Sequence, residues 1–205
     1  MLQKLGRFEQ SRAAYELTCR LAEQRHDDES KLYCLLGFAS LTVEMRSFAE
    51  TPQYPERAMQ LLATTPADSP YRLLYALLQG YVDLANGHLG EALEQFHRAL
   101  AGKQPDATSL TAHLGIAGAH LAAGHTTDAL QEARSALQTA TSLQGDLPYS
   151  YWTGTAWLTL GRAFAQLGDR VQARKAFETC ITHLSNTVDA NHPALLQARQ
   201  LLGAL

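Results

Sequence analysis

Eight histidines are the residues of this sequence best suited to chemistry, because imidazole binds metals and transfers protons near neutral pH. His113 and His120 are seven positions apart and would share one face of a helix, with His88, His97 and His125 not far away in the chain. A zinc site needs three or four converging ligands, and neither HxxH nor HExxH occurs. His88 and His125 each follow a glycine, where a polar residue commonly starts a helix. We therefore predict no metal site and no cofactor.

Other catalytic patterns are equally weak. Several carboxylates fall where a solvated helix face is expected: Glu91, Glu94, Asp128 and Glu132. The sequence contains no GxSxG, GxxxxGK[ST] or GxGxxG motif that would supply a nucleophile or cradle a phosphate. We predict no catalytic residue and a protein that is not an enzyme. A metal-dependent or hydrolytic enzyme that uses the histidines is the least supported alternative.

The three cysteines, Cys19, Cys34 and Cys180, have no CxxC spacing. Cys19 and Cys180 fall on the apolar side of helical patterns. We predict that all three are reduced thiols in a cytoplasmic protein, and that none is a ligand or a nucleophile.

Composition narrows the classes of partner. Hydrophobic residues make up 46% and charged residues 18% of the 205 residues, which suits a helical stack built on small side chains. A net charge of −3 gives no indication of binding to nucleic acid or to an anionic membrane. There is no apolar run long enough to span a membrane, and the first residues show no export signal.

Residues 157–180 carry the clearest structural pattern, which indicates two helices separated by a turn. One face of the first helix would carry Trp157, Leu160, Gly161 and Phe164. Gly168 can end that helix in the left-handed conformation, and Asp169 can cap the next. One face of the second helix would carry Ala173, Phe177 and Cys180. Gly161 and Ala173 are small where the helices would cross, so the backbones can approach closely.

This arrangement, W-x2-L-G-x2-aromatic followed by A-x3-F, resembles the tetratricopeptide (TPR) repeat family. The resemblance implies an all-α, TPR-like α-solenoid of antiparallel helix pairs with a C-terminal capping helix. Each pair needs stacked neighbours to bury both of its faces.

Looser copies of the pattern predict a single TPR-like domain over 1–205. Its parts are a half-repeat at 1–25, an irregular repeat at 29–66 with an insertion near 47–55, repeats at 70–102, 108–140 and 151–184, and a capping helix at 192–203. Ser69 and Pro70 mark a clear helix start, with Ser69 as the cap, and Gly102 is expected to end the following pair. The last helix would cover the final repeat with Leu195, Leu196, Leu201 and Leu202.

The two ends of the sequence suggest a larger context. The first repeat starts only about five residues before its turn glycine, Gly6. Either the chain belongs to a longer array, or Leu2, Leu5 and Phe8 pack on a partner or a second copy. The residues from His192-Pro193 to Ala198-Arg199 resemble the last repeats of TPR regions appended to bacterial signalling proteins, including kinases and ATPase regulators.

The TPR resemblance implies that first helices line a concave groove that holds a peptide. Carried onto this sequence, the peptide-binding residues would be Leu74, Leu77, Tyr81, Leu84, Leu114, Gly118, Leu121, Leu158, Arg162 and Gln166. One TPR subclass grips a C-terminal carboxylate with Lys and Asn, whereas these positions hold mostly apolar residues. We therefore expect an apolar peptide or helix as the ligand. The open alternative is that the same leucines simply pack the array.

The sequence thus favours a non-catalytic protein–protein interaction module, an adaptor or scaffold. The alternative is a C-terminal regulatory or self-association arm of a larger bacterial signalling protein, with a possible homodimer or contact with upstream repeats through the shortened first repeat.

Overall fold

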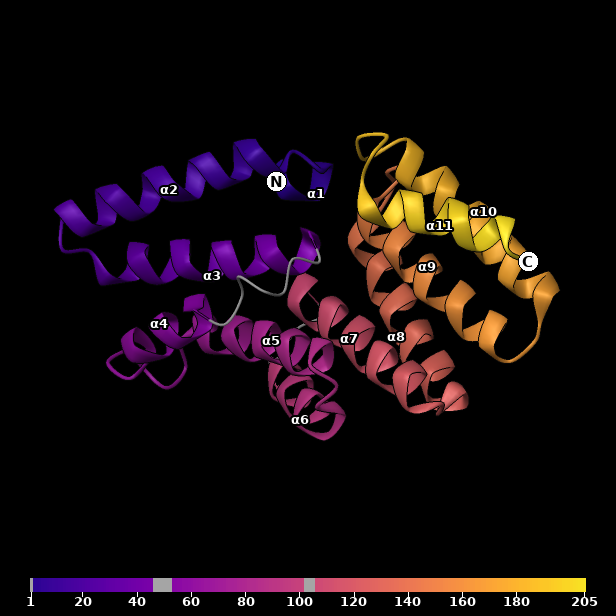
Figure 1. Cartoon of the computed structure of the whole chain (residues 1–205), viewed down its shortest axis with the longest axis horizontal. Coiled ribbons are helices and arrows are strands. Elements are labelled where there is room, and N and C mark those ends of the chain that lie inside the picture. The colour runs from indigo at the N-terminus through magenta and orange to yellow at the C-terminus, as the bar shows by residue number, and fades with distance from the viewer. Residues whose placement is uncertain (1, 46–52, 102–105) are drawn as a thin grey trace. The chain divides into compact units, whose positions relative to one another are not determined.

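The computed structural model describes residues 2–45, 53–101 and 106–205, and every element in these ranges is a helix. The prediction of an all-α fold is confirmed. The helices (Figure 1) are α1 (Leu2–Leu5), α2 (Phe8–Gln24), α3 (Asp28–Met45), α4 (Gln53–Leu62), α5 (Pro70–Ala85), α6 (Leu89–Ala99), α7 (Ala107–Ala123), α8 (Thr126–Gln144), α9 (Tyr151–Gln166), α10 (Arg170–Ser185) and α11 (Pro193–Gly203). Most of the insertion expected near 47–55, and the helix end expected at Gly102, lie outside the described residues.

The helices fall into two compact units, Met1–Ala101 and Gly102–Leu205, called here the N-terminal and C-terminal units. The N-terminal unit holds α1 to α6 and the C-terminal unit holds α7 to α11. The single domain over 1–205 stays a prediction.

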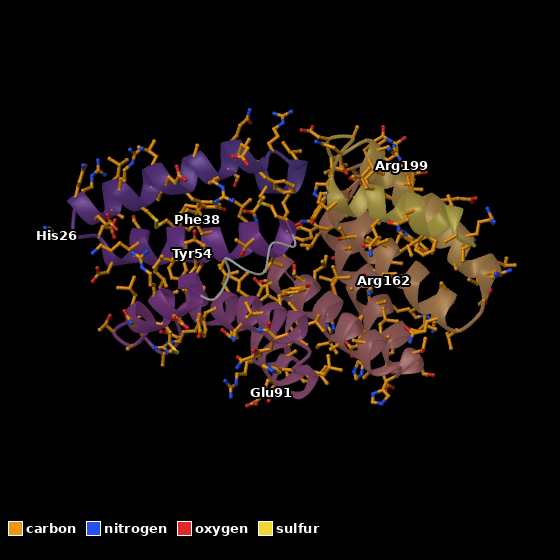
Figure 2. The ribbon with its side chains drawn as sticks, viewed as in Figure 1. His26, Phe38, Tyr54, Glu91, Arg162 and Arg199 are labelled. Atoms are coloured by element: carbon orange, nitrogen blue, oxygen red, sulfur yellow. A yellow bond between two sulfur atoms is a disulfide. The ribbon has the colours of Figure 1, made fainter. Side chains whose placement is uncertain are left out.

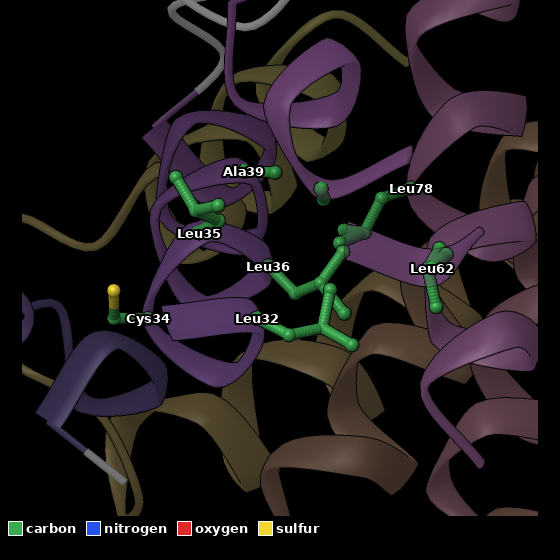
Figure 3. Close-up of a cluster of buried hydrophobic side chains, with 8 residues drawn as sticks. Leu32, Cys34, Leu35, Leu36, Ala39, Leu62 and Leu78 are labelled. Carbon is green, nitrogen blue, oxygen red and sulfur yellow. The ribbon is translucent and has the colours of Figure 1, made fainter. Parts of the chain in front are cut away.

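In the N-terminal unit, α3 is the central helix, packing against α2, α4 and α5, while α6 packs on α5. Its core (Figure 3) joins Leu32, Cys34, Leu35, Leu36 and Ala39 of α3 to Ala58 and Leu62 of α4 and Leu78 of α5. Phe38 of α3 stacks on Tyr54 of α4 with ring centroids 5.0 Å apart (Figure 2). The shortened first helix of the half-repeat is the four-residue α1, whose Gln3 donates a hydrogen bond to Ser40 of α3.

In the C-terminal unit, α7 pairs with α8 and α9 pairs with α10. The first helices α7 and α9 also pack on each other, and α11 packs on α10 and α9. Leu195 of α11 is buried, as predicted for a capping helix. Leu196 was predicted to cover the same face but is 49% exposed. Successive residues of a helix point about 100° apart, so Leu196 points away from the face on which Leu195 is buried.

The turns between paired helices follow the predicted chemistry. Gly168 adopts a φ of 81°, which only glycine reaches without strain, and the Asp169 carboxylate accepts a hydrogen bond from the amide of Gln172 at 3.1 Å. Ser69 does precede α5 and Pro70 does begin it, but the Ser69 hydroxyl makes no capping hydrogen bond within the described part of the chain. The fixed φ of Pro70 therefore contributes to the start of α5 where the cap does not.

A glycine facing an aromatic ring sets the spacing within several helix pairs. A Cβ atom on Gly161 would lie 2.5 Å from the Phe177 ring, and one on Gly80 would lie 2.7 Å from the Phe96 ring. In the α7–α8 pair the corresponding residues are Ala117 and Ala133, both fully buried. Either combination lets the two backbones approach closely.

We predict that Gly161→Ala lowers the free energy of unfolding by about 1–3 kcal/mol, because the added methyl overlaps a buried ring that has no space to move. Urea denaturation followed by circular dichroism measures this loss. Gly90→Ala in α6 is the control, since nothing lies within 4 Å of its added Cβ. This control should be neutral or raise stability by less than about 1 kcal/mol. An equal effect of the two substitutions would contradict the prediction.

Candidate functional site

The four candidate groove residues of α5 share one stripe of the helix, and much of that stripe is packed. Leu77 is buried, Leu74 packs against the core of the N-terminal unit, and Leu84 is half-buried. The Tyr81 ring meets Phe96 edge to face with centroids 5.0 Å apart. Burial of its hydroxyl, with a smaller contribution from Glu44, raises the pKa of Tyr81. The Tyr81 hydroxyl is therefore a neutral group that serves packing first.

In the C-terminal unit, the candidates on α7 differ in exposure. Leu121 is buried against Ala129 and Ala163. Leu114 is half-buried and packs beside Leu110, and Gly118 is half-buried. Leu114 and Gly118, one helical turn apart, are thus the α7 candidates that still reach the surface.

The candidates on α9 also divide. Leu158 is buried in the core that α11 helps to cover. Arg162 is half-buried (Figure 2), and Gln166 is exposed. The Gln166 side-chain amide donates a hydrogen bond to the Leu121 carbonyl of α7 at 3.2 Å, which ties the two first helices together. Leu77, Leu121 and Leu158 are buried, and peptide contact by the ten candidate residues stays a prediction.

The prediction that all three cysteines are free thiols is wrong. Cys19 of α2 and Cys34 of α3 form a disulfide, with Cα atoms 5.6 Å apart. Pairing of α2 with α3 brings the two residues together, and a separation of 15 residues with no motif gave no sign of it in the sequence. Cys180 is free and buried, as predicted, and burial raises the pKa of its thiol to about 12. That thiol is therefore neither a nucleophile nor a ready ligand.

A small cavity of about 180 Å³ lies beside the disulfide. Its walls are Cys19, Glu23, Lys31, Cys34, Leu35, Arg57, Gln60 and Leu61. A guanidinium nitrogen of Arg57 lies 3.9 Å from a carboxylate oxygen of Glu23, and both side chains are more than half exposed. The cavity mixes both charges with apolar walls and favours no single ligand class.

The histidines have separate surroundings. His113 Nδ1 lies 2.7 Å from a Glu132 carboxylate oxygen, which gives it a partner across the α7–α8 pair. His183 Nδ1 accepts the Ser150 amide at 3.2 Å, and partial burial lowers the pKa of His183, so its neutral form is favoured. The rings of His120 and His125 lie close together, with centroids 6.0 Å apart.

Comparison with known proteins places the best repeat. The tetratricopeptide repeat family model matches residues 154–182, which include the Gly161–Phe177 crossing. This segment is similar to a tetratricopeptide repeat. The resemblance inferred from 157–180 is therefore confirmed on the residues that carried it. No curated protein sequence matches the chain.

Solved structures extend the TPR-like fold beyond this repeat. BtubC (BKLC) from P. vanneervenii is similar with a TM-score of 0.69 and 18% identity, over 96% of this chain and 82% of that one. A variant of a putative kinesin light chain of Podosopora anserina, with nearly identical TPR-like repeats, has a TM-score of 0.58 and 20% identity, over 85% of this chain and 84% of that one. The TPR-like solenoid class is confirmed, and at these identities the likeness shows the fold alone.

TPR repeats generally bind protein partners, and the TPR-like fold is typically that of a non-catalytic interaction module. The fold thus supports the coarse prediction of a protein–protein interaction module. In the described ranges, no helix combines the length and apolar character needed to cross a membrane.

The disulfide yields a direct prediction. Thiol titration in denaturant should count one thiol, Cys180, before reduction and three after it. The bond closes a loop with a sequence separation of 15 residues, and Cys19→Ser/Cys34→Ser should therefore lower the free energy of unfolding by about 3 kcal/mol. Three thiols in the unreduced protein would contradict the pairing.

Proposed function

We propose that the chain is a non-catalytic adaptor that binds an apolar peptide or helix across the first helices of its TPR-like pairs. The observation that carries this proposal is the surface character of α7 and α9. These packed first helices offer the half-buried Leu114 and Gly118, with Arg162 as the charged residue among the candidates. In this proposal a large side chain of the ligand lies over Gly118, beside the apolar Leu114.

The chemistry of these positions favours an apolar segment over a carboxylate terminus. A carboxylate clamp needs several cations or amide donors. Among the ten candidates Arg162 is the one cation, and the Gln166 amide is already engaged with the Leu121 carbonyl. In the N-terminal unit, taken by itself, Leu84 and the exposed part of Leu74 and Tyr81 would offer an apolar contact of the same kind on α5. The ligand we propose therefore carries several large apolar side chains and is held along its length.

Peptide selection from a random library displayed on phage tests the class of ligand. Selected sequences should be rich in large apolar residues and should bind equally well with a free or an amidated C-terminus. Gly118→Trp, which fills the proposed space on α7, should weaken the selected peptide by about tenfold or more, as the loss of an anchor contact does. Gln138→Trp is the control, because Gln138 is exposed on α8.

Thermal unfolding of both variants should match that of the unchanged chain, so that lost binding reports on the surface and not on folding. Selection of peptides that need a free C-terminal carboxylate would contradict the proposal, as would full binding by Gly118→Trp.

Self-association is a second candidate function, and one surface of the N-terminal unit favours it. Leu17 and Leu21 lie one turn apart on α2 and are 50% and 40% exposed. Two exposed leucines on one face are a natural contact for another helix. A regulatory arm of a larger signalling protein would use such a face to meet a second copy or another domain.

Sedimentation velocity over a range of concentrations tests this candidate. We predict a concentration-dependent dimer that Leu17→Glu/Leu21→Glu converts to a monomer, because charge on this face opposes burial. Leu196→Glu, at a comparably exposed leucine of α11, should leave the dimer intact. A monomer at every concentration would remove this candidate.

A cytoplasmic location stays a prediction. The disulfide removes the argument from reduced thiols that partly supported it, because such bonds persist mainly in oxidising compartments.

A further inference from the structure

The turn between α7 and α8 gathers three metal-binding side chains. One ring nitrogen each of His120 and His125 and a carboxylate oxygen of Asp128 all lie within 4.8 Å of one another. Their chain spacing, with four and then two intervening residues, matches none of the usual zinc motifs, and Asp128 was not among the metal-ligand candidates of the sequence analysis. In the part of the chain that the structure describes, no other three His, Cys, Asp or Glu residues meet this spacing.

Backbone geometry brings the three side chains together. Gly124 ends α7 with a φ of 78°. The Gly124 amide donates a hydrogen bond to the Leu121 carbonyl at 3.2 Å, and the His125 amide donates one to the His120 carbonyl at 2.9 Å. This pair of hydrogen bonds defines a Schellman motif, in which the side chains corresponding to His120 and His125 commonly touch. Asp128 follows in the first turn of α8, three positions after His125 and on the same face.

The other repeats provide the same turn with different residues. The His88 amide bonds the Asp83 carbonyl at 2.9 Å, and the Asp169 amide bonds the Phe164 carbonyl at 3.0 Å. The positions equivalent to the three donors hold Asp83, His88 and Glu91 in one turn, and Phe164, Asp169 and Gln172 in the other. The Asp83 carboxylate accepts a hydrogen bond from Gln79 at 3.0 Å. The three turns therefore share one backbone geometry. Of these three, only the α7–α8 turn also brings three possible metal ligands together.

His120 has a buried ring nitrogen that a bound ion could satisfy. Its Nδ1 is buried and has no hydrogen-bond partner among the described residues. A buried polar nitrogen left without a partner is costly, and such atoms in folded proteins are usually satisfied by a protein group, water or an ion. The turn itself does not require histidine at this position, because the equivalent residues are Asp83 and Phe164.

We propose that His120, His125 and Asp128 bind a divalent first-row transition metal ion of the Zn²⁺ type. Two imidazoles and one carboxylate are a donor set that suits this ion, with water in the remaining position. Ligands about 2.0–2.2 Å from zinc in a tetrahedron are about 3.4 Å apart, so the three donors must draw slightly closer. His125 and Asp128 are exposed and can rotate to do so. The bound ion would fasten the end of α7 to the start of α8.

Calorimetric titration of the full chain, without a histidine tag, with Zn²⁺ tests the proposal. We expect one ion per chain, and a rise in melting temperature with zinc concentration, because an ion that binds only the folded state stabilises it. Co²⁺ should give the visible absorption of a bound ion with nitrogen and oxygen ligands. His125→Asn and Asp128→Asn should each weaken zinc binding by at least about tenfold. Loss of a residue that hydrogen-bonds to a metal ligand already lowers metal affinity by about that factor, and loss of the ligand itself should lower it further.

His88→Asn is the matched control, because His88 occupies the same position as His125 in the equivalent turn, and it should leave zinc affinity unchanged. His125 is exposed, so His125→Asn keeps the chain folded and circular dichroism should confirm this. The proposal is overturned if the unchanged chain takes up no zinc at millimolar concentration. It is equally overturned if His125→Asn/Asp128→Asn binds zinc as tightly, or if His88→Asn weakens binding as much. The proposed metal site uses none of the ten candidate peptide-binding residues, so neither result bears on the proposed adaptor function.

Discussion

Close approach of two helices at a small residue is the constraint on which each helix pair depends. Gly161 faces Phe177 and Gly80 faces Phe96 with no room for a single added carbon, while Ala117 and Ala133 meet in the α7–α8 pair. The aromatic ring contributes the apolar area, and the glycine lets the ring lie against the opposite backbone. The glycine–phenylalanine pairs and the alanine–alanine pair both allow close helix packing. Repeats that share few residues can therefore adopt the same fold.

This constraint also explains where function can reside. Each first helix must pack on its neighbours as well as on its partner helix. Its leucines Leu77 (α5), Leu121 (α7) and Leu158 (α9) are therefore buried in the core. What remains for a partner is the exposed remainder of those helices and the turns between them. The turns repeat one backbone geometry, so their side chains are free to differ. The candidate metal site at the α7–α8 turn and the asparagine–glycine and glycine–aspartate turns elsewhere are variants of that one geometry.

The disulfide adds a second kind of restraint in the N-terminal unit. Its half-repeat has only the four-residue α1 as a first helix, and the buried residues of α2 are Ser11 and Ala22. The covalent bond between Cys19 and Cys34 holds α2 to α3 beside the core that Leu32, Leu35 and Leu36 form. A helix with less packing thus gains a cross-link, which limits the disorder of the unfolded chain.

The sequence by itself determined the helix pairs, their turn glycines and the TPR-like repeat, because apolar spacing and glycine conformation are local properties readable along the chain. It also indicated the Gly161–Phe177 crossing, since a small and a large residue recur at fixed spacing. Tertiary structure alone decided the Cys19–Cys34 bond, the burial of Leu121 and Leu158, and the meeting of His120 with His125 and Asp128. Those outcomes depend on which way side chains of neighbouring helices point, and a helical pattern fixes a face without fixing what lies opposite it.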